Sequence, residues 1–285
     1  MKHRPPPLWL VLFATIALVG CSGVHRVAPD WSSGGAPPPP ASPRDETPAL
    51  TSDDRSVPSA TGCLIATTRF QPRHPQTQVP VILAPGFLRD RRQLHGLAAA
   101  LAARGIPVVT LNFCPRRPWI GQPVRNALDM LAVARWLGDK PVVYAGFSAG
   151  GLAALVAGRL DPHTLGVLTL DLVDSQGLGV GMARALRQPL LGLAGAPTAC
   201  NAHNNGLPVF AVAPQARLTR IPAASHCDFE SPTDWLCTRL CTGVDAGSPA
   251  RRQAIIDAAV TGVADLVGLT PRSLTPTAGP PHHPR

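Results

Sequence analysis

The sequence from residue 79 to residue 269 alternates short, continuous apolar runs with longer segments in which Ala and Leu recur every three or four positions. Short apolar runs bounded by Gly or Pro are typical of buried strands, and the longer spacing is typical of helices packed on a core. Strands are therefore predicted at 79–84, 106–113, 142–145, 165–170, 189–194 and 217–222, and helices at 91–104, 124–137, 149–160 and 251–269. Strands that alternate with helices build a mostly parallel, doubly wound sheet with helices on both faces, so we expect an α/β fold.

The two ends of the chain do not show this pattern. Residues 22–61 and 270–285 are rich in Pro and polar residues and have no apolar periodicity. Such segments bury too little apolar surface to offset the entropy that they would lose on ordering. We expect 22–61 to be a disordered Pro-rich tether, 62–269 to be one folded domain, and 270–285 to be a disordered tail.

Residues 1–21 have the features of an export signal. A basic start at 1–4 precedes an apolar run at 8–19 that is too short for a spanning helix of about 20 residues. The following Leu18-Val19-Gly20-Cys21 resembles the bacterial lipobox, and this resemblance implies cleavage before Cys21 and its acylation with fatty acids such as palmitate. The acyl chains would anchor the protein in the cell envelope, and Ser22 implies the outer membrane by the sorting rule of such lipoproteins. An ordinary secretory signal with an incidental cysteine is the alternative.

The cysteine content fits an exported protein. Without Cys21 an even set of six remains, namely Cys63, Cys114, Cys200, Cys227, Cys237 and Cys241. In an oxidising compartment these allow up to three disulfides, whose pairing the sequence alone does not decide. The spacings lack the paired C-x-x-C signature of a zinc site, so no metal is expected.

The formal net charge of +9 is spread over arginines rather than gathered in one block. No RNA-binding or helix-turn-helix signature accompanies it, so nucleic acid is not an expected partner. The excess of Arg favours solubility and attraction to an anionic surface or substrate.

The segment Gly146-Phe147-Ser148-Ala149-Gly150 lies between the predicted strand at 142–145 and the predicted helix at 149–160. A serine on such a tight strand–turn–helix stands above the edge of the sheet, and the glycines keep strand and helix from clashing. Ser148 is therefore the predicted nucleophile. The alternative is a plain Gly/Ser turn between two buried elements.

A serine hydroxyl needs a neighbouring base, and histidine held by a carboxylate is the usual one. His226 follows the last predicted strand, where a loop can bring an imidazole onto Ser148. We favour His226 over His203, which lies in the loop after the strand at 189–194. The alternative role for His203 is to stabilise its loop.

The acid is chosen largely by elimination. Residues 175–225 contain neither Asp nor Glu, so the carboxylate must come from the end of the strand at 165–170. Asp171 is the first polar residue after that strand, and the sheet fixes its backbone. We favour Asp171 over Asp174, and the one that is not catalytic is expected to form a turn.

Ester cleavage through a tetrahedral intermediate also needs two N–H donors for the oxyanion. The amide of Ala149 is one candidate, because it follows the nucleophile at a helix N-terminus. The second is the amide of Phe87, in the tight turn that follows the strand at 79–84. A plain turn packed by an aromatic ring is the alternative for Phe87.

The order Ser, Asp, His, the serine turn and the Gly86-Phe87 turn together resemble the α/β-hydrolase superfamily. More narrowly, Gly86-Phe87 and residues 103–109 look like segments of chlorophyllases, cutinase-like polyester hydrolases and platelet-activating-factor acetylhydrolases. Residues 170–174 resemble the chlorophyllase segment whose first Asp is the catalytic acid, which implies Asp171. Polyester hydrolases place their acid one strand later, where this chain has Gly195-Ala196-Pro197. The gap between Asp171 and residue 189 is too short for a large cap domain.

These expectations add up to a lipid-anchored, exported serine esterase that needs no metal or organic cofactor. The open cleft is expected to be edged by Arg89, Arg116 and Arg117 and by the loop at 200–205, which either contacts substrate or is a loop pinned by a disulfide. Two rivals remain. One is an acyltransferase that passes the acyl group to an envelope alcohol, and the other is a hydrolase-like binding protein without turnover. The natural ester and the oligomeric state stay open.

Overall fold

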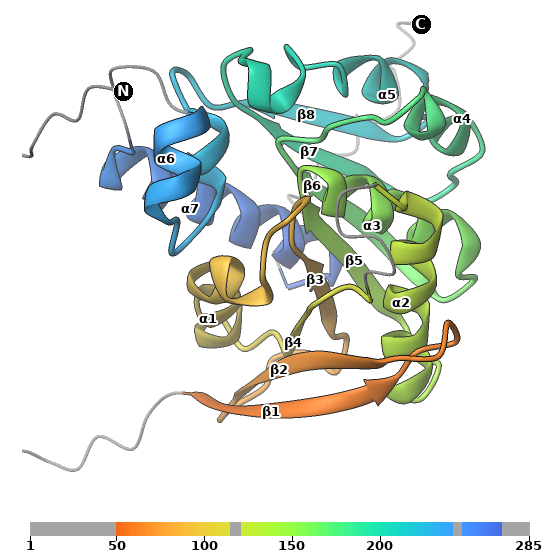
Figure 1. The fold of residues 1–285 in the computed structure, drawn as a ribbon. Helices are drawn as coiled ribbons and strands as arrows, with labels where there is room; N and C mark the ends of the chain where they lie inside the picture. Colours follow the sequence, from red (N-terminus) through yellow and green to blue (C-terminus); the bar gives the residue numbers. More distant parts are fainter. Residues whose placement is uncertain (1–49, 115–120, 242–246, 270–285) are drawn as a thin grey trace, which may run out of the picture. The chain divides into compact units, whose positions relative to one another are not determined.

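The computed structural model describes residues 50–114, 121–241 and 247–269. Its centre is an eight-stranded sheet with the strand order β1-β2-β4-β3-β5-β6-β7-β8 (Figure 1). β1 pairs antiparallel with β2, and β2 with β4, whereas the five remaining neighbouring pairs are parallel. The strands are β1 Leu50–Pro58, β2 Leu64–Pro72, β3 Val81–Ala84, β4 Val108–Leu111, β5 Val142–Phe147, β6 Thr164–Leu170, β7 Leu190–Ala194 and β8 Ala216–Arg220.

Helices cover both faces of this sheet (Figure 1). α1 (His95–Ala103) and α7 (Pro249–Leu266) pack on one face. The other face carries α2 (Pro123–Trp136), α3 (Ala149–Leu160), α4 (Leu178–Arg184) and α5 (Leu207–Val212). The remaining elements are α6 (Trp235–Cys241) and the 3-10 turns η1 (Arg91–Leu94), η2 (Ala199–Asn201) and η3 (His226–Phe229). Within the described ranges, no helix combines the length and hydrophobicity that crossing a membrane requires.

The central strand β5 shows why the apolar runs predicted this sheet. Val142 and Tyr144 join the core under α2 and α3, while Val143, Ala145 and Phe147 join the core under α1 and α7. Successive side chains of a strand point to opposite faces, and a strand covered on both faces must be apolar throughout. The predicted mostly parallel, doubly wound sheet is confirmed. α4 is the single helix between β6 and β7, so no large cap enters there.

The predicted start of the domain at residue 62 is wrong. Residues 50–58, expected in the tether, form β1, which pairs with the whole of β2 from Leu50 opposite Pro72 to Pro58 opposite Leu64. β1 is an edge strand of which only Val57 is buried, so it is polar, and its place depends on backbone hydrogen bonds that leave no apolar pattern. The expected signal at 1–21, the tether up to residue 49 and the tail at 270–285 lie outside the described residues.

All six cysteines of the domain are paired. The disulfides are Cys63–Cys114, Cys200–Cys241 and Cys227–Cys237. The first joins the residue before β2 to the segment after β4, and the other two lie beside the residues discussed next. Three disulfides in one domain are typical of a protein from an oxidising compartment.

Candidate active site

Ser148 occupies the sharp turn between β5 and α3. Its φ of 55° lies in the left-handed region, which costs a residue with a side chain about 1–3 kcal/mol. Its backbone N–H donates to the carbonyl of Leu170 at 2.8 Å, which ties the turn to β6. A Cβ added to Gly146 would overlap the backbone of Gly150, and one added to Gly150 would overlap the carbonyl of Pro85. The predicted need for both glycines therefore follows from close backbone contacts.

His226 and Asp171 complete a line of hydrogen bonds that starts at Ser148. The Nε2 atom of His226 lies 3.1 Å from the Ser148 Oγ, and its Nδ1 atom lies 2.6 Å from an Asp171 oxygen. All three residues are buried, and the imidazole packs against the ring of Phe147 with 4.6 Å between centroids. His203 is exposed in the turn after η2 and is not the histidine at Ser148. The contacts predicted for His226 and Asp171 are present, while their catalytic roles stay predictions.

The carboxylate of Asp171 is held by two donors that the sequence did not reveal. One oxygen accepts the Gly195 N–H at 3.0 Å, and the buried Asn201 amide donates to the other at 3.1 Å. Asn201 also donates to the carbonyl of Ala196 at 2.8 Å, which fixes the amide. The loop at 200–205 thus supports the acid and is also pinned by Cys200–Cys241. An asparagine is too common in loops to have been singled out from the sequence.

Asp174 has a different and local role. Its carboxylate accepts the N–H groups of Gly179 at 2.7 Å and Val180 at 3.3 Å, at the start of α4. These are first-turn amides that lack helical partners, so Asp174 stabilises the helix start. We expected the aspartate that is not the acid to have a local backbone role, and the contacts of Asp174 at the start of α4 are of that kind.

The predicted donors for an oxyanion come from two adjoining turns. The turn of residues 86–89 is closed by a 3.2 Å hydrogen bond from the Arg89 N–H to the Gly86 carbonyl. Because Gly150 lies directly against Pro85, this turn adjoins the start of α3. Ala149 is the first residue of that helix, so its amide has no intrahelical acceptor. Among the described residues the Phe87 amide has no acceptor either. Both amides fit the role, which stays a prediction.

A buried ion pair, also missed by the sequence reasoning, fastens the turn of residues 86–89. The Arg89 guanidinium makes a bidentate contact with Glu230 at 2.5 and 2.7 Å and reaches Asp234 at 3.0 Å. The Glu230 carboxylate is fully buried. Glu230 lies four residues after His226, so the pair joins the turn of Phe87 to the segment of the base. Arg89 also lines the cavity at Ser148, as expected, while Arg116 and Arg117 lie outside the described residues.

A cavity of about 240 Å³ opens at Ser148. Its volume is below the roughly 300–1,000 Å³ of most ligand sites, so it suits one part of a ligand. Apart from Ser148, His226 and Arg89, its walls are aromatic, aliphatic and sulfur side chains: Phe87, Leu88, Phe147, Cys200, Leu236, Cys237, Leu240 and Cys241. The side chains from 236 to 241 belong to α6. The site can thus present a nucleophile and a base to an apolar group.

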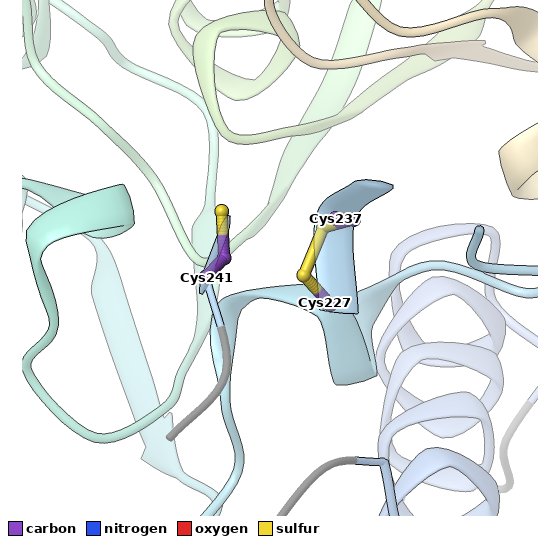
Figure 2. Close-up of side chains that lie close together, drawn as sticks. All are labelled: Cys227, Cys237 and Cys241. Atoms are coloured by element: carbon purple, nitrogen blue, oxygen red, sulfur yellow. A yellow bond between two sulfur atoms is a disulfide. The ribbon is translucent and has the colours of Figure 1, made fainter. Parts of the chain in front are cut away.

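Three cysteine sulfurs beside this cavity lie within 4.8 Å of one another (Figure 2). Cys227 and Cys237 form a disulfide, and Cys241 is bonded to Cys200. Metal ions bind the thiolate form of cysteine, which a disulfide does not offer. The cluster is therefore a pair of adjacent disulfides, and the expectation of no metal stays a prediction.

The fold resembles those of solved hydrolases. A dienelactone hydrolase from Anabaena variabilis superposes with a TM-score of 0.60 at 18% identity over 75% of this chain and 96% of its own. The esterase domain of a Rhodothermus marinus protein gives 0.58 at 15% identity over 75% of this chain and 99% of its own. No protein-family model matches the sequence, and no curated protein is significantly similar to it. The chain therefore has the α/β-hydrolase fold.

Proposed function

We propose that this protein is a serine hydrolase that cleaves carboxylic esters through an acyl-enzyme. The observation that carries the proposal is the line of hydrogen bonds from Asp171 through His226 to Ser148, with Ser148 on a strained turn at an apolar cavity. A fold does not determine a function, so the site residues carry the argument. The two structural neighbours, named as a hydrolase and as an esterase, agree with it.

In the proposed reaction the Ser148 Oγ attacks the ester carbonyl carbon while the Nε2 atom of His226 takes the hydroxyl proton. Asp171 accepts the Nδ1–H of His226 and stabilises the imidazolium that forms. The amides of Phe87 and Ala149 donate to the oxyanion of the tetrahedral intermediate. When the intermediate collapses, His226 gives its proton to the departing alcohol. Water then attacks the acyl-enzyme by the same steps and releases the carboxylic acid.

A fluorophosphonate probe tests this proposal directly, because it labels only an activated serine. We expect labelling of the wild-type chain, none of Ser148→Ala, and loss of p-nitrophenyl ester hydrolysis by about 10⁴-fold or more in Ser148→Ala and in His226→Ala. The double variant should be little worse than either single one, since the two residues act as a unit.

Labelling that persists in Ser148→Ala, or losses that add in the double variant, would contradict the assignment. A wild-type chain that takes the label, yet releases no carboxylic acid from an ester and forms a new ester once an alcohol is added, would favour the acyltransferase alternative. A wild-type chain that takes no label would favour the binding protein.

We also propose that the chain is exported and carries lipid on Cys21, in the envelope and on the outer membrane. The three disulfides of the described residues support export, because such bonds persist in oxidising compartments.

The proposed acid, Asp171, directly follows β6. This position favours the chlorophyllase-like arrangement over the polyester-hydrolase one, in which the acid follows one strand later.

A further inference from the structure

The outer face of α6 is unusually apolar. Trp235, Leu236 and Leu240 are 76%, 44% and 70% exposed, and Arg239 between them is exposed as well. Counted from Trp235, the other three residues follow after one, four and five positions, which places all four on one side of the helix. Helices at a protein surface normally turn such side chains to the core. The apolar side of α6 instead faces solvent.

Two disulfides hold α6 in this orientation. Cys237 and Cys241, one helical turn apart, point to the opposite side and bond Cys227 and Cys200. Figure 2 shows the Cys227–Cys237 bond with Cys241 beside it. Because both bonds would have to break before α6 could rotate, its outer face cannot be buried by a small movement of the helix. The exposure is therefore built into the covalent structure.

The exposed side chains surround the mouth of the cavity at Ser148. Phe87 and Leu88, 45% and 54% exposed, line the same cavity as Leu236 and Leu240, and Trp235 directly precedes Leu236 in α6. We call these five residues the apolar rim. They make up five of the eleven exposed large apolar side chains of the described residues, although they come from only two short segments. Such a concentration around a cavity marks a contact surface.

We infer that the apolar rim docks on a phospholipid surface and that the ester enters the cavity from that surface. The identity of the substrate rests on the proposed function, whereas the docking does not. Trp and Leu on one helix face insert at the boundary between headgroups and acyl chains, where the indole N–H can stay hydrated. Arg239 lies on the same face, and the whole chain carries +9, so an anionic lipid surface is the complementary one.

The docking is tested on the full chain carrying Ser148→Ala, so that no turnover is needed. The probe is a vesicle of equal parts phosphatidylcholine and phosphatidylglycerol with bromine on the acyl chains, which quenches tryptophans that enter the lipid. We expect Trp235→Phe to remove most of the vesicle-induced quenching. Trp136→Phe, on α2 where the ring packs against Arg69, should leave the quenching unchanged. Quenching that survives Trp235→Phe would overturn the inference.

Kinetics test the second half of the inference. Burial of a large apolar side chain contributes about 1.5–3 kcal/mol, so Trp235→Ser should lower hydrolysis of an ester held in vesicles about tenfold or more. Trp235 does not line the cavity, so hydrolysis of a dissolved short-chain ester should not change. Leu160→Ser, at an exposed apolar position at the end of α3 and outside the apolar rim, is the control and should change neither rate.

Equal losses on both substrates, or the same loss in Leu160→Ser, would contradict the surface role of α6. A wild-type chain that dimerises through the rim, with Trp235→Ser monomeric and no quenching by lipid, would assign the rim to a second copy and also overturn the inference. If no ester is cleaved while Trp235 is still quenched, the proposed function fails and the docking surface stands.

Discussion

Asp171 and Asp174 are three residues apart, and their partners predict opposite effects of the same substitution. The Asp171 carboxylate accepts from His226, Gly195 and Asn201, whereas the Asp174 carboxylate accepts the backbone N–H groups of Gly179 and Val180 at the start of α4. We expect Asp171→Asn to lower kcat about 10⁴-fold with the fold intact, because an amide cannot stabilise the imidazolium or fix its tautomer. Asp174→Asn should stay close to wild type, since Asn also caps helices well.

Ester kinetics together with circular dichroism would check this pair of variants. If Asp174→Asn were the inactive one, the assignment of the acid would be wrong. If both variants were active, Asp171 would only be structural.

Asp90 makes stability depend on pH. Burial alone would raise the pKa of its carboxyl, but hydrogen bonds from Arg92 and Asn112 outweigh this and lower it from 3.8 to about 2. A carboxyl with a depressed pKa in the folded state contributes stability that is complete above its unfolded pKa and is lost as pH falls through the folded value. Asp90→Asn should therefore lower the urea midpoint at neutral pH, and the difference should shrink below about pH 4 and be mostly lost near pH 2.

Asp139→Asn, at an exposed aspartate far along the chain, is the matched control and should leave the urea midpoint nearly unchanged. If the difference in urea midpoint for Asp90→Asn were as large at pH 2 as at neutral pH, the Asp90 carboxyl would not stabilise the fold through its charge. Because Asp90 follows directly on the turn of residues 86–89, we expect the same titration to loosen that turn.

At the scale of elements, the sequence predicted what is apolar and missed what is polar. The strands β3 to β7 and the helices α1, α2, α3 and α7 lie where the apolar runs predicted them, with ends shifted by a few residues. β8, a largely exposed strand at the other edge of the sheet, also lies close to the predicted 217–222. β1 and β2 form the half-exposed edge and gave no such signal. α4, α5 and α6 have seven residues or fewer, too short for a periodicity to be recognised.

The residues of the site also divide into those that the sequence predicted and those that it missed. Ser148 and Asp171 directly follow buried strands, and His226 lies in the loop after β8, so position along the chain was enough to predict that the three residues meet. Arg89, Glu230 and Asn201 act through partners 141 and 30 residues away, and only the folded structure brings these pairs together.

The Arg89–Glu230 pair ties the turn of residues 86–89 to the segment of His226, so we expect the position of the turn to depend on that segment. Removing one partner of a buried ion pair leaves an unpaired buried charge, which costs about 3–5 kcal/mol. We expect Glu230→Gln to destabilise the domain by roughly 3 kcal/mol and to lower kcat, because the turn of Phe87 is then no longer tied to the segment of His226. Asp234→Asn, which changes the more exposed partner of Arg89, is the control and should cost at most about 1 kcal/mol.

Urea unfolding measures the loss of stability in Glu230→Gln, and ester kinetics measure the loss of kcat. A double variant, Arg89→Met with Glu230→Met, should recover part of the lost stability without recovering kcat. Full activity in Glu230→Gln would show that the pair does not position the turn.

At the scale of the whole molecule, lipidation of Cys21 is the proposal that most affects where the protein works. The cysteine sulfur is the acyl acceptor, so Cys21→Ser should leave an uncleaved or soluble chain that partitions into the aqueous phase of a detergent extraction. Ser22→Ala, which retains the cysteine, should keep the wild-type mass shift and partitioning. An unchanged mass and partitioning in Cys21→Ser would remove the proposed anchor.

The two disulfides on α6 bear on how the protein can be prepared. In the chain-entropy account, closing loops of 10 and 41 residues contributes about 3 and 4 kcal/mol. A chain expressed in a reducing cytoplasm would lack these bonds and therefore a fixed α6 beside His226. Thiol titration would detect the free cysteines of such a batch and distinguish it from an oxidised batch of the same sequence. A poorly active batch would reflect the compartment of synthesis rather than the catalytic residues.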